Sequence, residues 1–491
     1  MTKDPLLLAF DIGTSSSRTA LFDLRGKRLI RTTAQQAYSL IRSQDGGAEI
    51  SPQNLLRSVL DCLQGTFARY RHDKSLRGRP IVATGASCFW HSLVGTDSRG
   101  RALTPIYTWA DSRCHNDAAR LRLKLSERVI HARTGCMLRA SYWPAKLCWL
   151  RRTQPRLFGS VSFWMSPGEW LQWQFCGRAN CAYAMASGTG LFNPTTLDWD
   201  DELLRVSGIR RNALNPLRED TVTTSGTFAR RFPELKAAQW FPAIGDGAAS
   251  NLGSGSTRPG LAAINYGTSG AVRVIRHGRR ARAPFGLFCY RVDAEQFLVG
   301  GAVSNAGNLY AWALRELNME ADPQKLERAL ASRPFPVEEL TVLPFWVSER
   351  APTWQEDIRG TIIGVTQATT ALDLFQAIQE ASFYRLAWIA ELMSQSTGRR
   401  LRFTVSGGLP SSRSGMQRLA NVLGSELTVC SEREASLRGA AIFALEKLGW
   451  KVSASAKGQV IRPQPAVARK YSEARRRHLK LEKHLIEALY G

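Results

Sequence analysis

Two short segments with the same Gly-Thr-Ser tripeptide are the first candidates for chemistry in this 491-residue chain. Residues 11–18 read Asp-Ile-Gly-Thr-Ser-Ser-Ser-Arg, and residues 265–270 read Asn-Tyr-Gly-Thr-Ser-Gly. Each tripeptide follows an apolar run and precedes a run typical of strands, which predicts two β-hairpins with small, hydroxylated turns. Backbone N–H groups in such turns can converge on an anion, and glycine lets phosphate approach closely. One turn in each half of the chain predicts a clamp on a nucleotide phosphate tail.

Two aspartates stand in settings that suit phosphoryl transfer. Asp11 ends the first apolar run, where a carboxylate can hold hydrated Mg²⁺ beside phosphates or can simply cap a turn. Asp246 lies in Gly-Asp-Gly-Ala at 245–248, directly before a predicted helix. It could accept the proton of an attacking hydroxyl, although spacing alone favours a helix N-cap.

A third cluster suits a polyhydroxylated ligand. Trp109 and Asp111 belong to Thr-Trp-Ala-Asp-Ser-Arg at 108–113. Tryptophan stacks on C–H faces, while the carboxylate and the guanidinium of the same segment bind hydroxyl or carboxyl groups in defined geometry. A packed loop closed by an ion pair explains these residues equally well.

Two further segments contain groups able to contact a ligand. His91, which follows Trp90, is either a partner for a sugar hydroxyl or a structural histidine. Ser-Gly-Gly at 406–408 links a predicted strand to a predicted helix. Its two glycines permit a flat ring or a phosphate to approach the positive end of that helix, but they also simply make turns.

Alternating strands and helices must position these residues. The apolar pattern predicts strands at residues 6–13, 19–23, 81–85, 262–275 (a hairpin), 296–300, 402–406 and 427–429. It predicts helices at residues 53–70, 112–131, 166–176, 304–317, 371–395 and 435–448. This alternation indicates an α/β protein. We divide the chain into domains 1–245 and 246–450, followed at 451–491 by a linker (452–466) and a basic C-terminal helix.

Composition narrows the function classes. The net charge is +25, which suits a nucleic-acid partner or reflects a generally arginine-rich surface. We favour the second interpretation because the basic residues are spread along the whole chain. The nine cysteines form no Cys-x-x-Cys pair and no zinc-type spacing, which predicts reduced thiols in a cytoplasmic protein. We expect no secretion signal and no membrane span, since no apolar run has the needed length.

Taken in order, these segments resemble the FGGY family of carbohydrate kinases, within the actin-like ATPase superfamily. Further segments that carry the resemblance are Ser-Gly-Thr-Gly-Leu-Phe-Asn (187–193), Leu-Asp-Trp-Asp (197–200) and Glu-Arg-Ala-Pro (349–352). The resemblance covers residues 6–448. It implies two ribonuclease-H-like domains, of the actin and hexokinase type, around an interdomain cleft. It also implies that ATP and Mg²⁺ serve to phosphorylate a hydroxyl of a sugar or sugar acid.

The resemblance implies roles for individual residues. Asp246 would be the general base, and Asp11 would hold Mg²⁺ through water. The residues around the nucleotide and its phosphates would be Gly13, Thr14, Ser15, Ser16, Arg18, Gly267, Thr268, Gly307, Gly407, Gly408 and Ser412. The residues around the sugar would be Trp90, His91, Trp109 and Asp111, together with Asp246.

Within the family, the motifs are most similar to those of gluconokinases, which implies conversion of gluconate to 6-phosphogluconate. Xylulokinases share several of these motifs, so a xylulokinase or another pentulose or polyol kinase is the alternative. Residues 135–146 lack the His and the Met-Ser-Pro expected in gluconokinases, and Trp90 stands where Met is usual. Both segments face the sugar in the family, so the departures concern the sugar and leave phosphoryl transfer unaffected.

Two other classes are less consistent with the sequence. A non-catalytic sugar or nucleotide sensor could use the basic charge to bind nucleic acid, but no DNA-reading module is visible and every expected reactive residue is present. A filament-forming or chaperone-like ATPase would not need the sugar-facing segments. We expect a small-molecule sugar or sugar acid as partner, no specific nucleic acid and no membrane; a homodimer stays open.

Overall fold

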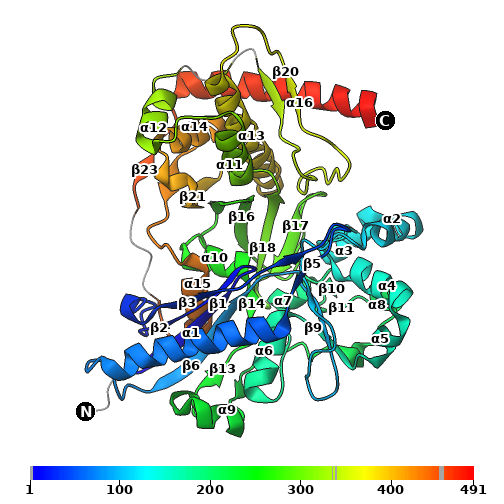
Figure 1. Ribbon diagram of the computed structural model, residues 1–491, viewed down its shortest axis with the longest axis vertical. Helices are drawn as coiled ribbons and strands as arrows, with labels where there is room; N and C mark the ends of the chain where they lie inside the picture. The colour runs from blue at the N-terminus through cyan, green and yellow to red at the C-terminus, as the bar shows by residue number, and fades with distance from the viewer. Residues whose placement is uncertain (1–3, 334–335, 338–339, 453–457, 491) are drawn as a thin grey trace.

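The computed structural model describes residues 4–333, 336–337, 340–452 and 458–490. Two sheets of seven strands each form the centres of two halves, which lie one above the other in Figure 1. The strands of the first sheet come from the first half of the chain, and those of the second sheet from the second half. Helices flank both sheets, so the predicted α/β class is confirmed.

The first sheet brings the carboxyl ends of three parallel strands together. β1 (Leu6–Ile12) pairs antiparallel with β2 (Ser16–Phe22) and parallel with β6 (Ile81–Cys88). β14 (Ile244–Gly245) runs parallel to β6. Every residue of β1 is buried, as expected for a central strand. The other strands of this sheet are β3 (Ala34–Ala37), β12 (Val222–Thr223) and β13 (Gln239–Trp240).

Helix α1 (Pro52–His72) packs on the first sheet, and its sequence explains both its start and its buried face. The Ser51 hydroxyl accepts a hydrogen bond from the N–H of Asn54 at 3.3 Å, which satisfies a free donor of the first turn. Apolar residues then recur at helical spacing. Those that are fully buried are Leu55, Val59, Leu63 and Phe67.

The single helix expected at 112–131 is instead two helices, α2 (His115–Lys124) and α3 (Glu127–Thr134). Leu125 and Ser126 between them have extended backbones. Ser126 takes the N-cap position of α3 without a side-chain cap bond, and Glu127 places a negative charge in the first turn, where it complements the positive end of the helix. The other helices of this half are α4 (Trp143–Thr153), α5 (Pro155–Ser160), α6 (Pro167–Cys176), α7 (Tyr183–Ser187), α8 (Asp201–Ser207) and α9 (Gly226–Arg231). Its short outer strands are β4 (Ile41–Arg42), β5 (Ala48–Ile50), β7 (Val94–Thr96), β8 (Ile106–Tyr107), β9 (Phe163–Met165), β10 (Phe192–Asn193) and β11 (Asp198–Trp199).

The second sheet repeats the central pattern of the first. β15 (Leu261–Tyr266) pairs antiparallel with β16 (Gly270–His277), as predicted, and parallel with β21 (Arg402–Gly407). Its other strands are β17 (Phe288–Arg291), β18 (Gln296–Val303), β22 (Leu427–Val429) and β23 (Val460–Ile461). The helices are α11 (Gly307–Glu316), α12 (Pro323–Ala331), α13 (Ala371–Thr397) and α14 (Arg413–Leu423). A separate two-stranded sheet consists of β19 (Thr341–Leu343) and β20 (Thr361–Ile363).

The C-terminal segment is tied into the second half. The predicted linker at 452–466 contains β23, which pairs antiparallel with β22, while residues 453–457 lie outside the described part of the chain. Helix α16 (Pro465–Tyr490) then crosses the far end of this half, shown in red in Figure 1. Arg385 of α13 donates from Nη1 to Glu482 Oε2 of α16 at 2.6 Å. Arg385 also pairs with Glu349, and all three side chains are 2–3% exposed.

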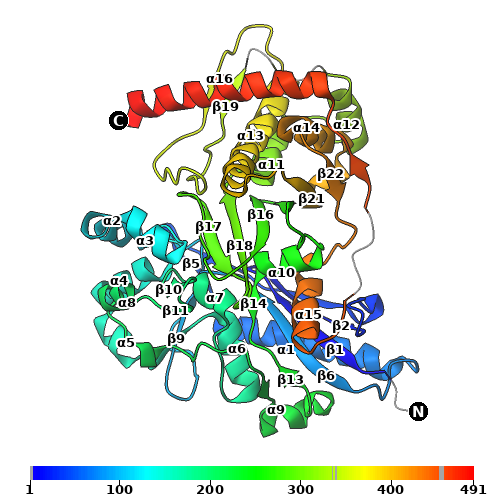
Figure 2. The same ribbon diagram turned by 180° about the vertical axis from the view of Figure 1, so that it is seen from behind.

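Helix α15 (Ala435–Lys447) lies in the chain between β22 and β23 of the second sheet but packs on the first. Its apolar residues form one buried cluster with those of β1, β2 and β6. A Cβ built on Gly85 of β6 would lie 2.2 Å from the carbonyl oxygen of Ala440, so strand and helix backbones touch there. Figure 2 shows α15 beside α10 (Asp246–Gly253), where the two halves join. The expected boundary at residue 245 falls between the strands of the two sheets, whereas α15, which comes after it in the chain, packs on the first sheet.

Candidate active site

Asp11 and Asp246 reach the same edge of the first sheet through the register of three strands. Asp11 of β1 and Ile244 of β14 both pair with Ser87 of β6. Asp246 comes two residues after Ile244 and is the first residue of α10. Gly245, and not Asp246, occupies the N-cap position of that helix. The structure thus does not give Asp246 the capping role that its spacing favoured.

Burial controls the ionisation of both carboxylates. It raises the pKa of Asp11 to about 6, against the opposing charge of Arg18, whose Nη1 lies 3.2 Å from Asp11 Oδ2. The nearby negative charges of Asp246 and Glu434 raise the pKa of Asp11 further. Burial also raises the pKa of Asp246, which Arg273 of β16 counteracts. A carboxylate with a raised pKa is a stronger base, as proton transfer near neutral pH requires.

The surroundings of Asp11 fit a magnesium ion. Its pKa is raised because the neighbouring positive charge does not fully offset burial and the two other carboxylates. A hard cation that binds oxygen ligands would supply the missing charge. Across the residues that the structure describes, no cluster of three or more His, Cys, Asp or Glu could hold a metal. Mg²⁺ would therefore bind Asp11 together with water and phosphate oxygens, a pattern common for this ion.

The first Gly-Thr-Ser turn joins β1 to β2 as predicted. The N–H of Gly13 donates to the carbonyl oxygen of Ser16 at 3.0 Å, which closes the turn. Thr14 is half-buried and Ser15 is exposed, so this turn presents hydroxyl groups to solvent, while Ser16 is buried. Arg18 lies on β2 opposite Asp11, where its side chain is held by that carboxylate.

The second Gly-Thr-Ser turn, between β15 and β16, is one residue shorter than the first. Tyr266 pairs with Gly270 across it, leaving three residues between them, while four separate the equivalent pair of the first hairpin. The N–H of Gly267 donates to Ser269 O at 3.0 Å. Helix α11 begins directly on this turn, because the N–H of Gly307 donates to Gly267 O at 2.9 Å. A Cβ on Gly307 would lie 2.4 Å from that oxygen, so glycine is needed there.

A cavity of about 800 Å³ opens next to this second turn. Five of the residues expected around the nucleotide line it: Gly267, Thr268, Gly307, Gly408 and Ser412. Leu309, Trp312 and Trp346 add apolar surface. Flat aromatic and aliphatic walls beside glycine-rich turns suit a purine base with a phosphate tail.

The Gly-Gly turn after β21 shapes the far wall of this cavity. Gly407 has φ +93°, and a Cβ there would lie 2.4 Å from Tyr266 O, so its role is to bend the chain. Gly408 lines the cavity itself. Ser412 caps α14 by accepting the N–H of Gly415 at 3.0 Å. The Ser412 hydroxyl also bonds Glu327 Oε2 at 2.9 Å.

His91 lies among aromatic rings. Its Nδ1 bonds the carbonyl oxygen of Gly188, and its ring centroid is 4.9 Å from that of Tyr142 and 5.6 Å from that of Tyr290. Burial lowers its pKa to about 3, so the ring is neutral at physiological pH. His91 can therefore bond a hydroxyl but does not carry charge.

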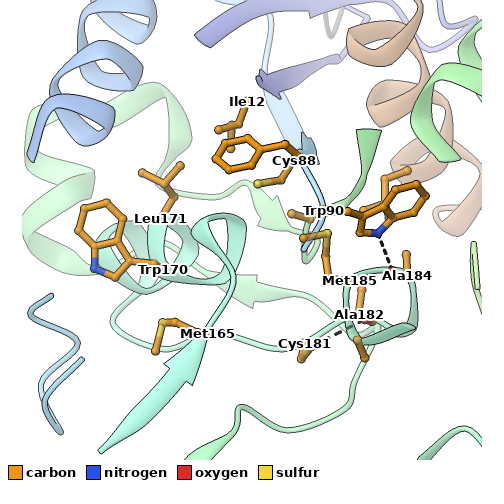
Figure 3. Close-up of a cluster of buried hydrophobic side chains, with 14 of the residues drawn as sticks. Ile12, Cys88, Trp90, Met165, Trp170, Leu171, Cys181, Ala182, Ala184 and Met185 are labelled. Atoms are coloured by element: carbon orange, nitrogen blue, oxygen red, sulfur yellow. Dashed lines mark hydrogen bonds between the residues drawn. The ribbon is translucent and has the colours of Figure 1, made fainter. Parts of the chain in front are cut away.

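Trp90 packs against the two glycines that flank Asp246. Its indole is 5% exposed, and Nε1 donates to Ala184 O at 2.9 Å, as Figure 3 shows. A Cβ on Gly245 would lie 1.8 Å from the indole, and one on Gly247 would lie 2.6 Å from it. Much of the indole surface is thus used in packing against these two glycines, and the sugar contact expected of Trp90 stays a prediction.

Trp109 and Asp111, from one motif, have different surroundings. Trp109 is half-buried, and the Arg350 guanidinium lies 5.2 Å from its ring centroid. Asp111 is 2% exposed, accepts the N–H of Ala48 at 3.2 Å and pairs with Arg113. Of the two interpretations of this motif, the packed ion pair describes Asp111.

Sequence reasoning missed two arginines near Asp246. Arg273 follows the second Gly-Thr-Ser turn on β16, and Arg350 belongs to Glu-Arg-Ala-Pro at 349–352. Burial lowers the pKa of Arg273 and lowers that of Arg350 to about 10. The motifs were visible in the sequence, but no local pattern shows that both positive charges come close enough to Asp246 to lower its pKa.

Comparisons with known proteins identify the fold. None of the described helices is long and apolar enough to cross a membrane. Models of the FGGY family of carbohydrate kinases match residues 6–237 with its N-terminal domain and residues 262–447 with its C-terminal domain. The chain is 28% identical to gluconokinase of Bacillus subtilis (strain 168) over 461 residues, 90% of this chain and 88% of that protein.

Two solved structures extend this likeness over the whole molecule. Gluconate kinase from Lactobacillus acidophilus superimposes with a TM-score of 0.90 at 25% identity, covering 99% of each chain. Xylulose kinase from the same organism gives a TM-score of 0.90 at 24% identity, again covering 99% of each chain. The expected two-domain, actin-like α/β fold is confirmed. The chain belongs to the FGGY family of carbohydrate kinases and is an ATP- and Mg²⁺-dependent sugar kinase.

Proposed function

We propose that this kinase phosphorylates gluconate to 6-phosphogluconate, with Asp246 as the general base. The observation that carries the proposal is the position of Asp246. It is half-buried, has a raised pKa, shares a sheet edge with Asp11 and is approached by Arg273 from the second half. A base for an attacking hydroxyl needs this combination of basicity and proximity to the phosphate site.

In the proposed reaction, each group of residues has a separate role. Asp246 takes the proton of the sugar hydroxyl as that oxygen forms a bond to the γ-phosphorus and the bond to the ADP oxygen breaks. The turns at Gly13 and Gly267 supply backbone N–H groups and hydroxyls for the phosphates, and Arg18 adds positive charge. Bound Mg²⁺ would neutralise charge on the phosphate oxygens. The cavity beside α11 receives the purine.

Gluconate as the substrate is supported by the relatives that share the site segments. The curated gluconokinase of B. subtilis matches over most of both chains, and the Glu-Arg-Ala-Pro segment fits that branch.

The free state of all nine cysteines supports a reducing location, the cytoplasm.

A substrate panel with one variant tests both parts of the proposal. ADP release from ATP is measured with gluconate, xylulose and glycerol. We expect gluconate to be preferred, and Asp246→Asn to lower kcat by at least about 10²-fold, as loss of a general base does. Asp198→Asn, in a surface ion pair with Arg211, is the matched control and should keep full activity. Near-normal turnover by Asp246→Asn would rule out Asp246 as the general base. If the enzyme phosphorylates xylulose but not gluconate, gluconate is ruled out as the substrate.

A further inference from the structure

Positive charge near Asp246 is not balanced by the carboxylates of the site. Arg273 and Arg350 both lie close enough to Asp246 to affect its ionisation, yet no ion pair joins either arginine to a carboxylate among the described residues. Lys146 adds a third positive charge near His91. It is 1% exposed and is held by two carbonyl oxygens, those of Ala140 and Ser141. Arg273 and Arg350 are half-buried, and charges shielded from water are normally paired, so this excess of positive charge predicts an anionic ligand.

Arg273 is the arginine with free donors. Its Nε is buried and has no hydrogen-bond partner in the described structure. By contrast, Arg350 donates from Nε to Ser304 Oγ at 3.2 Å and from Nη2 to Val303 O at 3.1 Å. Its guanidinium also lies over Trp109. Arg350 is therefore a fixed source of positive charge, while Arg273 can still bind a ligand.

Two glycines, one near the base and one near the end of the Arg273 side chain, leave room for its path. Gly300 of β18 pairs with Arg273 across the sheet, and a Cβ there would lie 3.1 Å from Arg273 Cγ. A Cβ on Gly247 of α10 would lie 2.8 Å from Arg273 Nε. The side chain thus runs from the second sheet, over one glycine, to the backbone beside Asp246. The aromatic pair Tyr142 and Tyr290, joined by a 2.7 Å hydroxyl–hydroxyl bond, lies next to this region.

We propose that Arg273 binds the carboxylate of the substrate, so that the sugar site selects a polyhydroxy acid over a neutral polyol or ketose. The inference rests on the proposed function, because it places the transferred hydroxyl at Asp246. A guanidinium offers two parallel N–H donors to a carboxylate, which gives both affinity and orientation. The positive charge of Arg350 also attracts the carboxylate, while its Nε and Nη2 groups keep their hydrogen bonds to Ser304 and Val303. A neutral substrate would leave the buried Nε of Arg273 without a partner, which disfavours its binding.

The test compares two ligands that differ at one carbon and two variants on one strand. D-gluconate and D-glucitol share their hydroxylated carbons, but glucitol has CH₂OH in place of the carboxylate. Binding of each is measured by calorimetry, alongside the KM for gluconate. Arg273→Gln removes the charge, and Arg273→Lys keeps the charge without the fork. Arg276→Gln, three residues further along β16 and stacked on Phe297, is the control.

We expect Arg273→Gln to weaken gluconate binding and raise its KM by about 10–100-fold, the usual effect of losing a charged hydrogen bond. Glucitol binding should change by less than about 3-fold, Arg273→Lys should recover part of the loss, and Arg276→Gln should match the wild type. Melting temperatures show whether each variant is folded. If folded Arg273→Gln lowers the affinities for gluconate and glucitol equally, the carboxylate contact is wrong while gluconate remains the substrate.

Other outcomes separate this inference from the proposed function. The enzyme could fail to phosphorylate gluconate but phosphorylate another six-carbon sugar acid in a reaction that requires Arg273. That result would rule out gluconate as the substrate and support the contact between Arg273 and the carboxylate. If the wild type binds glucitol as tightly as every sugar acid, or turns over neutral sugars alone, the contact is overturned.

Discussion

Gly253 at the end of α10 and Gly439 in α15 meet where the two helices cross. A Cβ on Gly253 would lie 2.8 Å from the Gly439 nitrogen and 1.8 Å from Ala435 O. A Cβ on Gly439 would lie 1.7 Å from Ala249 O. The backbones therefore touch directly. Because α10 begins at Asp246 and α15 lies on β1 and β6, this contact fixes Asp246 relative to the first sheet.

Gly439→Ala should destabilise the protein by at least about 2 kcal/mol and lower kcat, because the helices must separate to admit a methyl group. Unfolding in urea and kcat report the two effects. Gly159→Ala, in helix α5 with nothing within 4 Å of its Cβ position, is the control and should be neutral or stabilising. A Gly439→Ala protein with wild-type stability would contradict the close crossing.

Asp11→Asn should stabilise the protein in the absence of Mg²⁺ and ATP, with the full effect at pH values above about 6. The folded pKa of about 6 exceeds the usual 3.8, so ionised Asp11 destabilises the folded state above pH 6 and the penalty vanishes below pH 3.8. The asparagine variant should thus gain about 1–3 kcal/mol at pH 8 and little near pH 4. Urea unfolding at both pH values measures this, and equal stability changes at the two would refute it. Catalysis should fall sharply.

Trp90 and Gly245 should be strongly coupled. Gly245→Ala alone drives a methyl group into the indole and should reduce activity severely. In a Trp90→Met background, the flexible side chain can move aside, so the same change should cost at least about 1 kcal/mol less. A double-mutant cycle on unfolding free energy and on kcat/KM gives the coupling, and additive effects would argue against direct contact.

The pH dependence of catalysis should not involve His91. Its pKa of about 3 lies below the range in which unperturbed histidines titrate. His91→Asn preserves a donor for Gly188 O and suits the left-handed backbone of residue 91, whose φ is 63°. The acid limb of kcat/KM between pH 5 and 8 should therefore keep its midpoint in this variant, even if KM rises. A shifted or missing limb would assign the titration to His91.

Glu482→Gln should cost about 3–5 kcal/mol, because it leaves the buried Arg385 with reduced compensation. It should also raise KM, since Arg385 holds Glu349, the neighbour of Arg350. Glu487→Gln, also on α16 but 60% exposed, is the control and should change stability by under about 0.5 kcal/mol. Chemical denaturation and initial rates measure both effects. A Glu482→Gln enzyme as stable as the control would show that the buried pair contributes nothing.

Local sequence patterns were sufficient for the hairpins and most elements. Gly13 and Gly267 close turns where small residues interrupt two apolar runs, and these signals need no tertiary information. The single helix predicted across 112–131 failed because apolar spacing does not register a two-residue break at Leu125 and Ser126.

The packing of distant segments could not be predicted in this way. α15 is apolar on most sides, so its sequence indicates burial without indicating that the first sheet buries it. Trp90 has an indole that suits stacking on a sugar, yet three-dimensional packing turns it under Gly245. Arg273 lies on a recognised hairpin, but only the glycines at 247 and 300 reveal its direction.

The buried ion group on α16 has a consequence for the newly made chain. Glu482 follows its partner Arg385 by 97 residues along the chain. A growing chain therefore contains all strands of the first sheet, and Arg385 itself, before it contains the carboxylate that Arg385 needs for burial. Chains that stop short of residue 482 should leave this guanidinium without that partner, and we expect them to aggregate and to lack kinase activity.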